Sequence, residues 1–180
     1  MSEPLKNRFP SFASLVPVYS VMVVMLYGWT LVAFIWKLPS WLNYLTMGEM
    51  LVILAYSFFA NLLESLSVLG LLLLICAILP PSFLLDNFAV RGTVIVLTLL
   101  GSGMFFLARY VTVGQSIGLI WPIWLATTLA ILSACLALAQ KVKAVRAAVF
   151  WLADQLTVFL YIFLPLSILS AAVVLFRNIF

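Results

Sequence analysis

Apolar residues fill the chain in long runs, which short polar or proline-containing breaks separate. The runs lack the two-residue alternation of a membrane barrel strand, and each is long enough for a bilayer-crossing helix of about 20 residues. Lipid offers no hydrogen-bond partners, so a span has to satisfy its own backbone, as a helix does. The pattern predicts an all-α, polytopic transmembrane helical bundle of about five spans, in a single membrane domain with no soluble domain. The expected spans are residues 14–36, 44–79, 88–108, 116–140 and 150–176.

The second run is unusually long for a single span. No turn signal interrupts it until Pro80 and Pro81 end it. A continuous helix of about 36 residues would measure about 54 Å, against a hydrocarbon core of about 30 Å. We therefore expect this helix to tilt, to kink or to project from the membrane. Its first half carries Glu49 and Glu64, and the sequence leaves open whether residues 44–67 lie in the bilayer, at its surface or beyond it.

Two residues of the fifth run have expected structural roles. Pro165 lies in its middle, where a proline predicts a kink or the loss of one helical hydrogen bond. Asp154 is expected in the first turn of the same helix, near the positive end of the helix dipole. We favour that role over catalysis for Asp154.

Composition supports the membrane assignment and narrows the chemistry. The chain is 67% hydrophobic and 8% charged, whereas an ordinary soluble domain is about a quarter charged. It contains no His, which removes the commonest metal ligand and the base of a Ser-His-Asp triad. We therefore expect no cofactor, no bound metal and no catalytic residue. Cys76 and Cys135 fall inside apolar runs, where small buried side chains are a simpler interpretation than a disulfide or metal pair.

The positive charges indicate how the chain crosses the membrane. The formal net charge is +4, but Lys and Arg are scattered beside the apolar runs, which favours a topological signal over a nucleic-acid surface. With five spans, six positive residues fall on the side of the N-terminus and three on the other. Positive residues mark the cytoplasmic side, so we predict a cytoplasmic N-terminus and a C-terminus on the opposite side. The six are Lys6, Arg8, Arg91, Lys141, Lys143 and Arg146, and the three are Lys37, Arg109 and Arg177.

Polar residues on the second run share one face of the predicted helix. At about 100° per residue they fall within an arc of roughly 140°, and leucines fill the opposite arc. A carboxylate that faces lipid is costly, so we expect this face to point into the bundle, toward a partner or toward water. It is then either a path for an ion, proton or substrate, or an interfacial or interhelical contact. This polar stripe comprises Glu49, Tyr56, Ser57, Asn61, Glu64 and Ser67.

Small residues and a basic stretch complete the candidate contacts. Small side chains let helix backbones approach where lipid gives no hydrophobic drive for association. The basic stretch between the fourth and fifth runs could contact anionic headgroups, although a topological role explains it as well. The small candidates are Gly101, Gly103, Ala126, Ala130, Ala134, Ser167 and Ala171, and the basic ones are Lys141, Lys143 and Arg146.

These patterns predict a multi-pass integral membrane protein. The leading hypothesis is a non-catalytic subunit or partner-binding module, which associates with other membrane subunits or with itself in the lipid bilayer and does not bind nucleic acid. One alternative is a small transporter or channel with a polar path along the face from Glu49 to Glu64. A second is a membrane enzyme that acts on lipid through Glu64 or Asp86.

Overall fold

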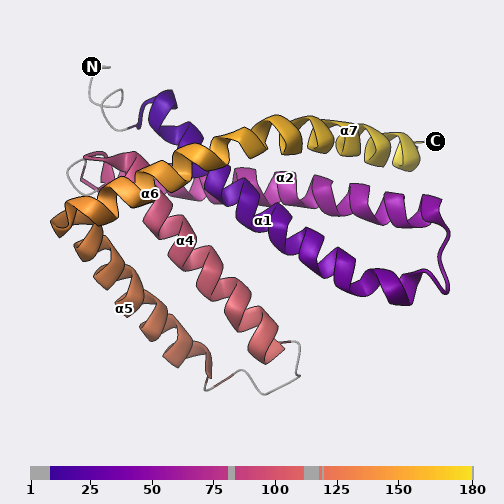
Figure 1. The fold of residues 1–180 in the computed structure, drawn as a ribbon, viewed down its shortest axis with the longest axis horizontal. Helices are drawn as coiled ribbons and strands as arrows, with labels where there is room; N and C mark the ends of the chain where they lie inside the picture. The colour runs from indigo at the N-terminus through magenta and orange to yellow at the C-terminus, as the bar shows by residue number, and fades with distance from the viewer. Residues whose placement is uncertain (1–8, 81–83, 112–117, 119, 180) are drawn as a thin grey trace.

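The computed structural model describes residues 9–80, 84–111, 118 and 120–179, which form helices joined by short turns, with no strand among them. A π-helix, η2 (Leu107–Val111), extends α4, and a 3₁₀ turn, η3 (Leu156–Phe159), joins α6 to α7. The α-helices are α1 (Phe12–Trp41), α2 (Met47–Ile78), α4 (Phe88–Phe106), α5 (Ile120–Lys141), α6 (Lys143–Gln155) and α7 (Leu160–Ile179) (Figure 1).

Five helical rods of the described chain are long and apolar enough to cross a membrane. They are α1, α2, α4 with η2, α5, and the continuous stretch Lys143–Ile179. The predicted all-α bundle of about five spans is confirmed, and the chain is a multi-pass membrane protein. The predicted start of the fourth span at residue 116 lies outside the described residues, as do Lys6 and Arg8.

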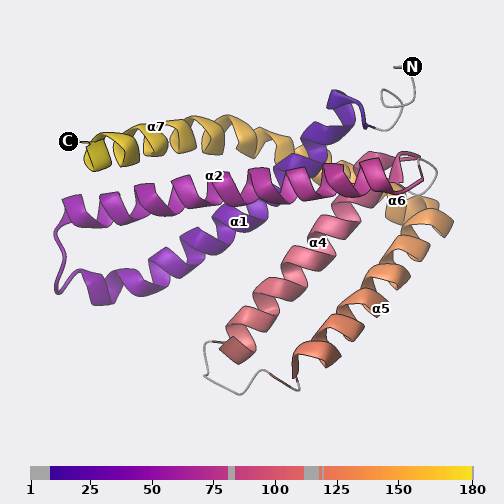
Figure 2. The same ribbon diagram turned by 180° about the vertical axis from the view of Figure 1, so that it is seen from behind.

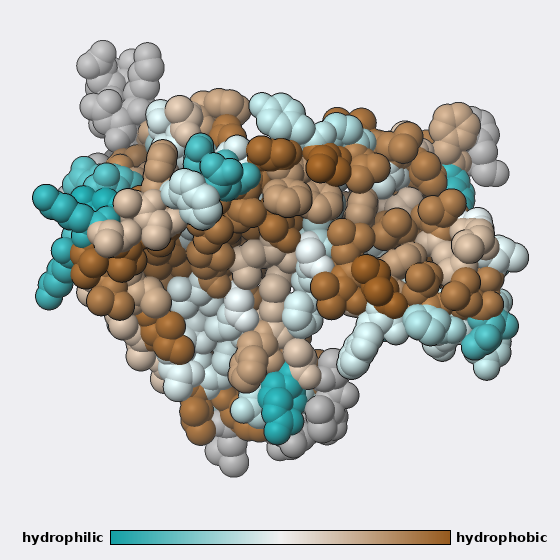
Figure 3. All heavy atoms as spheres, viewed as in Figure 1, coloured by the Kyte–Doolittle hydropathy of each residue, from teal (hydrophilic) through white to brown (hydrophobic). Residues whose placement is uncertain are grey.

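Two groups of helices diverge from a common end (Figures 1 and 2). α1, α2 and α7 run side by side in one group, and α4 and α5 form a pair in the other. The groups meet near the start of α1, where α6 packs against α1, α4 and α5. Hydrophilic residues gather mostly at this common end, whereas apolar residues cover most of the α1–α2–α7 group in the same view (Figure 3).

The first half of α1 lies at the centre of the molecule. Val18, Val21 and Met22 are fully buried and belong to a core cluster with residues of α2, α4 and α6. Gly92 on α4 permits a close approach, because a Cβ atom there would lie 3.1 Å from a methyl carbon of Val18. The second half of α1 leaves this core, and Trp36 is 90% exposed.

α2 is one uninterrupted helix of 32 residues, so its first half contains no break. A length of about 48 Å exceeds a hydrocarbon core of about 30 Å, which leaves tilting or projection as the way to fit the bilayer. A capping box fixes its start, since the backbone N–H of Glu49 donates to Thr46 Oγ1 at 3.3 Å. In return the backbone N–H of Thr46 donates to the Glu49 carboxylate at 2.8 Å.

The fifth helical rod begins before residue 150, the predicted start of the fifth span. α6 starts at Lys143, and Val142 alone separates it from the end of α5. Arg146 explains the tight junction, because its guanidinium donates to the carbonyl oxygens of Ala139 at 3.3 Å and Gln140 at 2.6 Å. These carbonyls belong to the last turn of α5, where helices leave acceptors unsatisfied.

Asp154 lies near the end of α6, so its predicted place in a first helical turn is wrong. Pro165 lies inside α7 without ending the helix. The departure from α-helical geometry falls before the proline, in η3.

Candidate functional site

The predicted polar stripe of α2 does not line one enclosed site. Of its six residues only Asn61 is buried, Ser57 is half-buried and the other four are exposed. The four exposed residues face outward because α2 packs a neighbouring arc of its surface against α1 and α7. That buried arc is formed by Met50, Phe58, Asn61, Ser65, Leu72 and Cys76.

The first two residues of the stripe along the chain have local structural roles. Glu49 belongs to the capping box, where its carboxylate also accepts from Thr46 Oγ1 at 2.9 Å. The hydroxyl of Tyr56 accepts from the side-chain amide of Asn178 at 3.0 Å, which joins α2 to the last turn of α7. Neither residue needs a ligand to explain its position.

Three further residues of the stripe differ in whether their polar groups have hydrogen-bond partners. Asn61 Oδ1 accepts from Thr30 Oγ1 of α1 at 3.0 Å, but no described group accepts from the buried Nδ2 of Asn61. Ser57 and Ser67 donate back to the carbonyls four residues earlier in α2, at 2.8 and 2.7 Å. Serine hydroxyls within membrane helices satisfy themselves in this way without a partner chain.

Glu64 is the exception in the stripe. Its side chain is exposed and makes no hydrogen bond or ion pair with the described residues. It lies about 26 Å from the start of α2 and about 21 Å from its end. Its exposed neighbours Leu63 and Leu71 are apolar, at 51% and 60% exposure. The structure therefore presents a carboxyl group to the surroundings near the middle of a spanning helix, where a charge is costly.

Within the bundle, Tyr27 of α1 bonds two other helices, and the sequence pattern does not single it out. Its hydroxyl bonds Ser167 Oγ of α7 at 2.5 Å and donates to the carbonyl of Phe58 in α2 at 3.3 Å. Its ring packs against Phe58 and Phe163, with centroids 5.2 and 4.8 Å away. Tyr27 thus ties α1, α2 and α7 together.

Two further hydroxyl groups of α1 join it to other helices. Ser20 Oγ donates to the carbonyl of Ala153 in α6 at 3.1 Å, and Tyr19 bonds Ser65 of α2 at 3.2 Å. A hydroxyl group in the interior of an apolar run is the sequence signal for such residues, because it has to bond either within its own helix or to another helix. The partners themselves are far away in the sequence.

The predicted small-residue contacts divide into buried and exposed positions. Ser167 is fully buried at the Tyr27 contact, and Ala171 is half-buried. A Cβ atom on Gly101 would meet only Met25 at an ordinary 3.7 Å, and one on Gly103 would meet nothing within 4 Å. The close helix contact falls at Gly92 instead. The row on α5, formed by Ala126, Ala130 and Ala134, is exposed.

The predicted headgroup contacts also differ from one another. Lys141 and Lys143 are exposed at the common end of the molecule, where a headgroup could reach them. Arg146 is half-buried and its guanidinium holds the end of α5, as described above. Cys76 is buried, Cys135 is half-buried, and both are free thiols.

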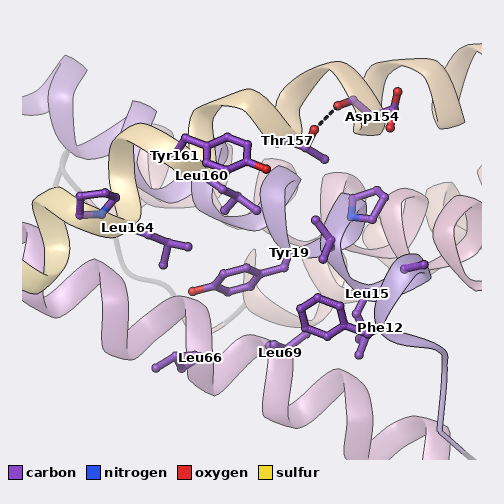
Figure 4. A pocket seen from close by; sticks show the side chains of 14 residues that line it. Phe12, Leu15, Tyr19, Leu66, Leu69, Asp154, Thr157, Leu160, Tyr161 and Leu164 are labelled. Atoms are coloured by element: carbon purple, nitrogen blue, oxygen red, sulfur yellow. Dashed lines mark hydrogen bonds between the residues drawn. The ribbon is translucent and has the colours of Figure 1, made fainter.

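A groove of about 840 Å³ opens between α2 and the α6–α7 rod, and the first turns of α1 form its floor. Figure 4 shows Phe12, Leu15 and Tyr19 of α1 facing Leu66 and Leu69 of α2, with α7 on the other side. Most of the lining is apolar, and Asp154 and Thr157 lie at one end. The sequence pattern did not predict this groove, because three helices distant in sequence build it.

Comparison of the chain with protein-family models, with curated proteins and with solved structures gives no significant match.

Proposed function

We propose that this chain is a non-catalytic subunit of a membrane assembly and that it binds its partner through the outward face of α2. Glu64 carries the proposal. Its carboxyl group is exposed near the middle of a spanning helix and has no partner among the described residues. A partner helix that donates a hydrogen bond or a positive charge would supply what the described chain lacks at this depth.

The energetics favour such an association. An acidic side chain at the centre of a membrane helix costs about 2.5–3.5 kcal/mol on insertion scales. A polar partner lowers that cost, and polar bonds between membrane helices contribute about 1 kcal/mol each. Ala60 and Ser67 lie one turn before and after Glu64, and both are small and exposed. Small side chains on this face let a second backbone approach closely.

Two kinds of partner meet these requirements. A different membrane subunit could offer Lys, Arg or a hydroxyl at the depth of Glu64. A second copy of the chain could offer its own Glu64, because a protonated carboxyl group both donates and accepts hydrogen bonds. The mass of the purified assembly separates the two.

The alternatives have weaker support. A transport path along the Glu49–Glu64 face needs a second wall from another chain, since four of the six stripe residues face outward. Chemistry on lipid through Glu64 and Asp86 needs neighbouring groups, and Asp86 lies in the turn before α4, away from the middle of α2. We therefore rank assembly first.

We also infer that the common end of the two helix groups is cytoplasmic. Lys141 and Lys143 are exposed there, whereas Lys37, Arg109 and Arg177 lie toward the far ends of α1, η2 and α7. An excess of Lys and Arg on one side marks the cytoplasmic face of a membrane protein.

The test compares Glu64→Leu and Glu64→Gln with the wild-type chain in native mass spectrometry from mild detergent. Glu64→Leu should weaken the assembly about tenfold, because a bond worth about 1–2 kcal/mol is lost. Glu64→Gln should retain an assembly held by a hydrogen bond and lose one held by an ion pair. Leu51→Ala is the control and should change nothing, because Leu51 is 66% exposed and lies about 140° around α2 from Glu64.

A wild-type chain that purifies as a monomer without a companion would overturn the proposal. An assembly that persists in Glu64→Leu would also count against it, because the proposed contact would then contribute nothing. Mass measurement reports both outcomes in the same experiment.

A further inference from the structure

The groove between α2 and α7 runs from a polar end to an apolar end. Asp154 and Thr157 line the polar end, and Leu66 and Leu164 line the other (Figure 4). A volume of about 840 Å³ lies within the range of small-ligand sites, which are mostly apolar with a few placed polar groups. The lining therefore has the polarity profile of an amphiphile.

The α6–η3–α7 rod fixes the depth of the polar end. Its charged residues before the span end at Asp154, and residues 156–176 contain no Lys, Arg, Asp or Glu. That uncharged stretch measures about 31 Å as a helix, which matches a hydrocarbon core of about 30 Å. Asp154 and Thr157 thus lie near the headgroup level, and the rest of the groove descends into the core.

The charge at the polar end selects among headgroups. The Asp154 carboxylate is exposed and has no ion pair or hydrogen bond with the described residues. Thr157 is occupied, since its hydroxyl donates to the backbone carbonyl of Asp154 at 2.6 Å. An unpaired carboxylate attracts a protonated amine and repels a headgroup that carries only negative charge.

The size of the groove favours a chain over a helix. An α-helix with its side chains is about 10–12 Å across, so about 840 Å³ holds only one to two of its turns. An extended acyl chain is thinner and can follow the groove from the headgroup level inward.

We propose that this groove binds a phospholipid whose headgroup carries a protonated amine, as phosphatidylethanolamine does. The amine lies at Asp154, and an acyl chain follows Leu66, Leu69 and Leu164 into the core. The lipid belongs to the leaflet on the side where α1 begins, whichever way the chain is oriented. Leu66 and Leu69 lie about 140–160° around α2 from Glu64, so the site is independent of the proposed assembly face.

The test uses full-length protein in nanodiscs made from equal amounts of phosphatidylethanolamine and phosphatidylglycerol with identical acyl chains. Native mass spectrometry then counts each lipid retained after release from the disc. The wild-type chain should retain the amine lipid about tenfold over the other, the lower end of what a charge-assisted hydrogen bond provides. Asp154→Asn should bring the ratio near one, and Asp86→Asn, another exposed carboxylate, should leave it unchanged.

A second variant tests the apolar part of the site. Leu66 is 49% exposed, so Leu66→Trp can fill the groove without disturbing the core, and it should abolish retention of either lipid. Leu71→Trp, on the opposite arc of α2, should retain the wild-type pattern. Equal retention of both lipids by the wild-type chain would overturn the headgroup assignment. If the wild-type chain retains no lipid, the proposed site is wrong. It is also wrong if Leu66→Trp releases a bound polypeptide and not a lipid.

Discussion

Individual hydroxyl groups form hydrogen bonds between the spans of this bundle. Tyr27 and Ser20 are fully or almost fully buried, and each bonds a group on another helix. Lipid provides no water to compete with these bonds, but it also provides no partner once they are lost. A single hydroxyl deletion in the interior should therefore be measurable.

Tyr27→Phe tests the contribution of one such group. The variant keeps the ring contacts with Phe58 and Phe163 and removes the bonds to Ser167 and the Phe58 carbonyl. We expect a loss of about 0.5–1.5 kcal/mol in the free energy of unfolding, the range found for polar bonds between membrane helices. Unfolding by increasing fractions of denaturing detergent measures it. Tyr161→Phe is the control, because Tyr161 is 83% exposed, and an equal loss in both variants would contradict the assignment.

At the scale of the helices, the sequence predicts that a helix forms better than it predicts where that helix begins. Long apolar runs have to become helices in lipid, and all five are present. The fifth rod begins before residue 150 because Arg146 caps the end of α5 and lets α6 begin at once, whereas the basic residues Lys141, Lys143 and Arg146 indicate a loop in the sequence. The periodicity of α2 predicted a polar face but not its direction, since that depends on where α1 and α7 pack.

The α1–α4 contact depends on one glycine. A Cβ atom at position 92 would lie 3.1 and 3.2 Å from the two methyl carbons of Val18, which is fully buried. We expect Gly92→Ala to destabilise the protein by about 1–3 kcal/mol, as overpacking does in a close-packed core. The same unfolding titration measures it. Gly103→Ala, where a Cβ would meet nothing within 4 Å, should be neutral.

A compensating change sharpens this prediction. Val18→Ala removes the two methyl groups that the new Cβ would meet, so the double variant Val18→Ala with Gly92→Ala should recover part of the loss. Additive losses in the double variant would show that the two positions do not interact.

At the scale of the whole molecule, the two helix groups share one end and diverge toward the other (Figure 1). The α5–α6 junction lies at the common end, and the α1–α2 turn lies at the far end of the other group (Figure 1). The apolar runs do not predict which helices form each group or that the two groups diverge, because both depend on packing between spans that are distant in the sequence.

Labelling from each side tests the inferred orientation. A cysteine introduced as Lys143→Cys should react with a membrane-impermeant maleimide in inverted vesicles and not in intact cells. Tyr44→Cys, in the α1–α2 turn and 85% exposed, should show the reverse. The unchanged chain, whose Cys76 is buried and Cys135 half-buried, gives the background. Reaction of Lys143→Cys from outside intact cells would reverse the orientation.

The central place of α1 has a consequence for biosynthesis. Of the described helices α1 leaves the ribosome first, yet Ser20 and Tyr27 bond residues 133 and 140 positions later. At a synthesis rate of about 5–20 residues per second, these hydroxyls wait about 7–30 s for their partners. A nascent chain that stalls before α6 therefore holds a first helix that can pack against α2 and α4 but whose Ser20 and Tyr27 lack their partners on α6 and α7, which is the form that insertion chaperones and membrane proteases would encounter.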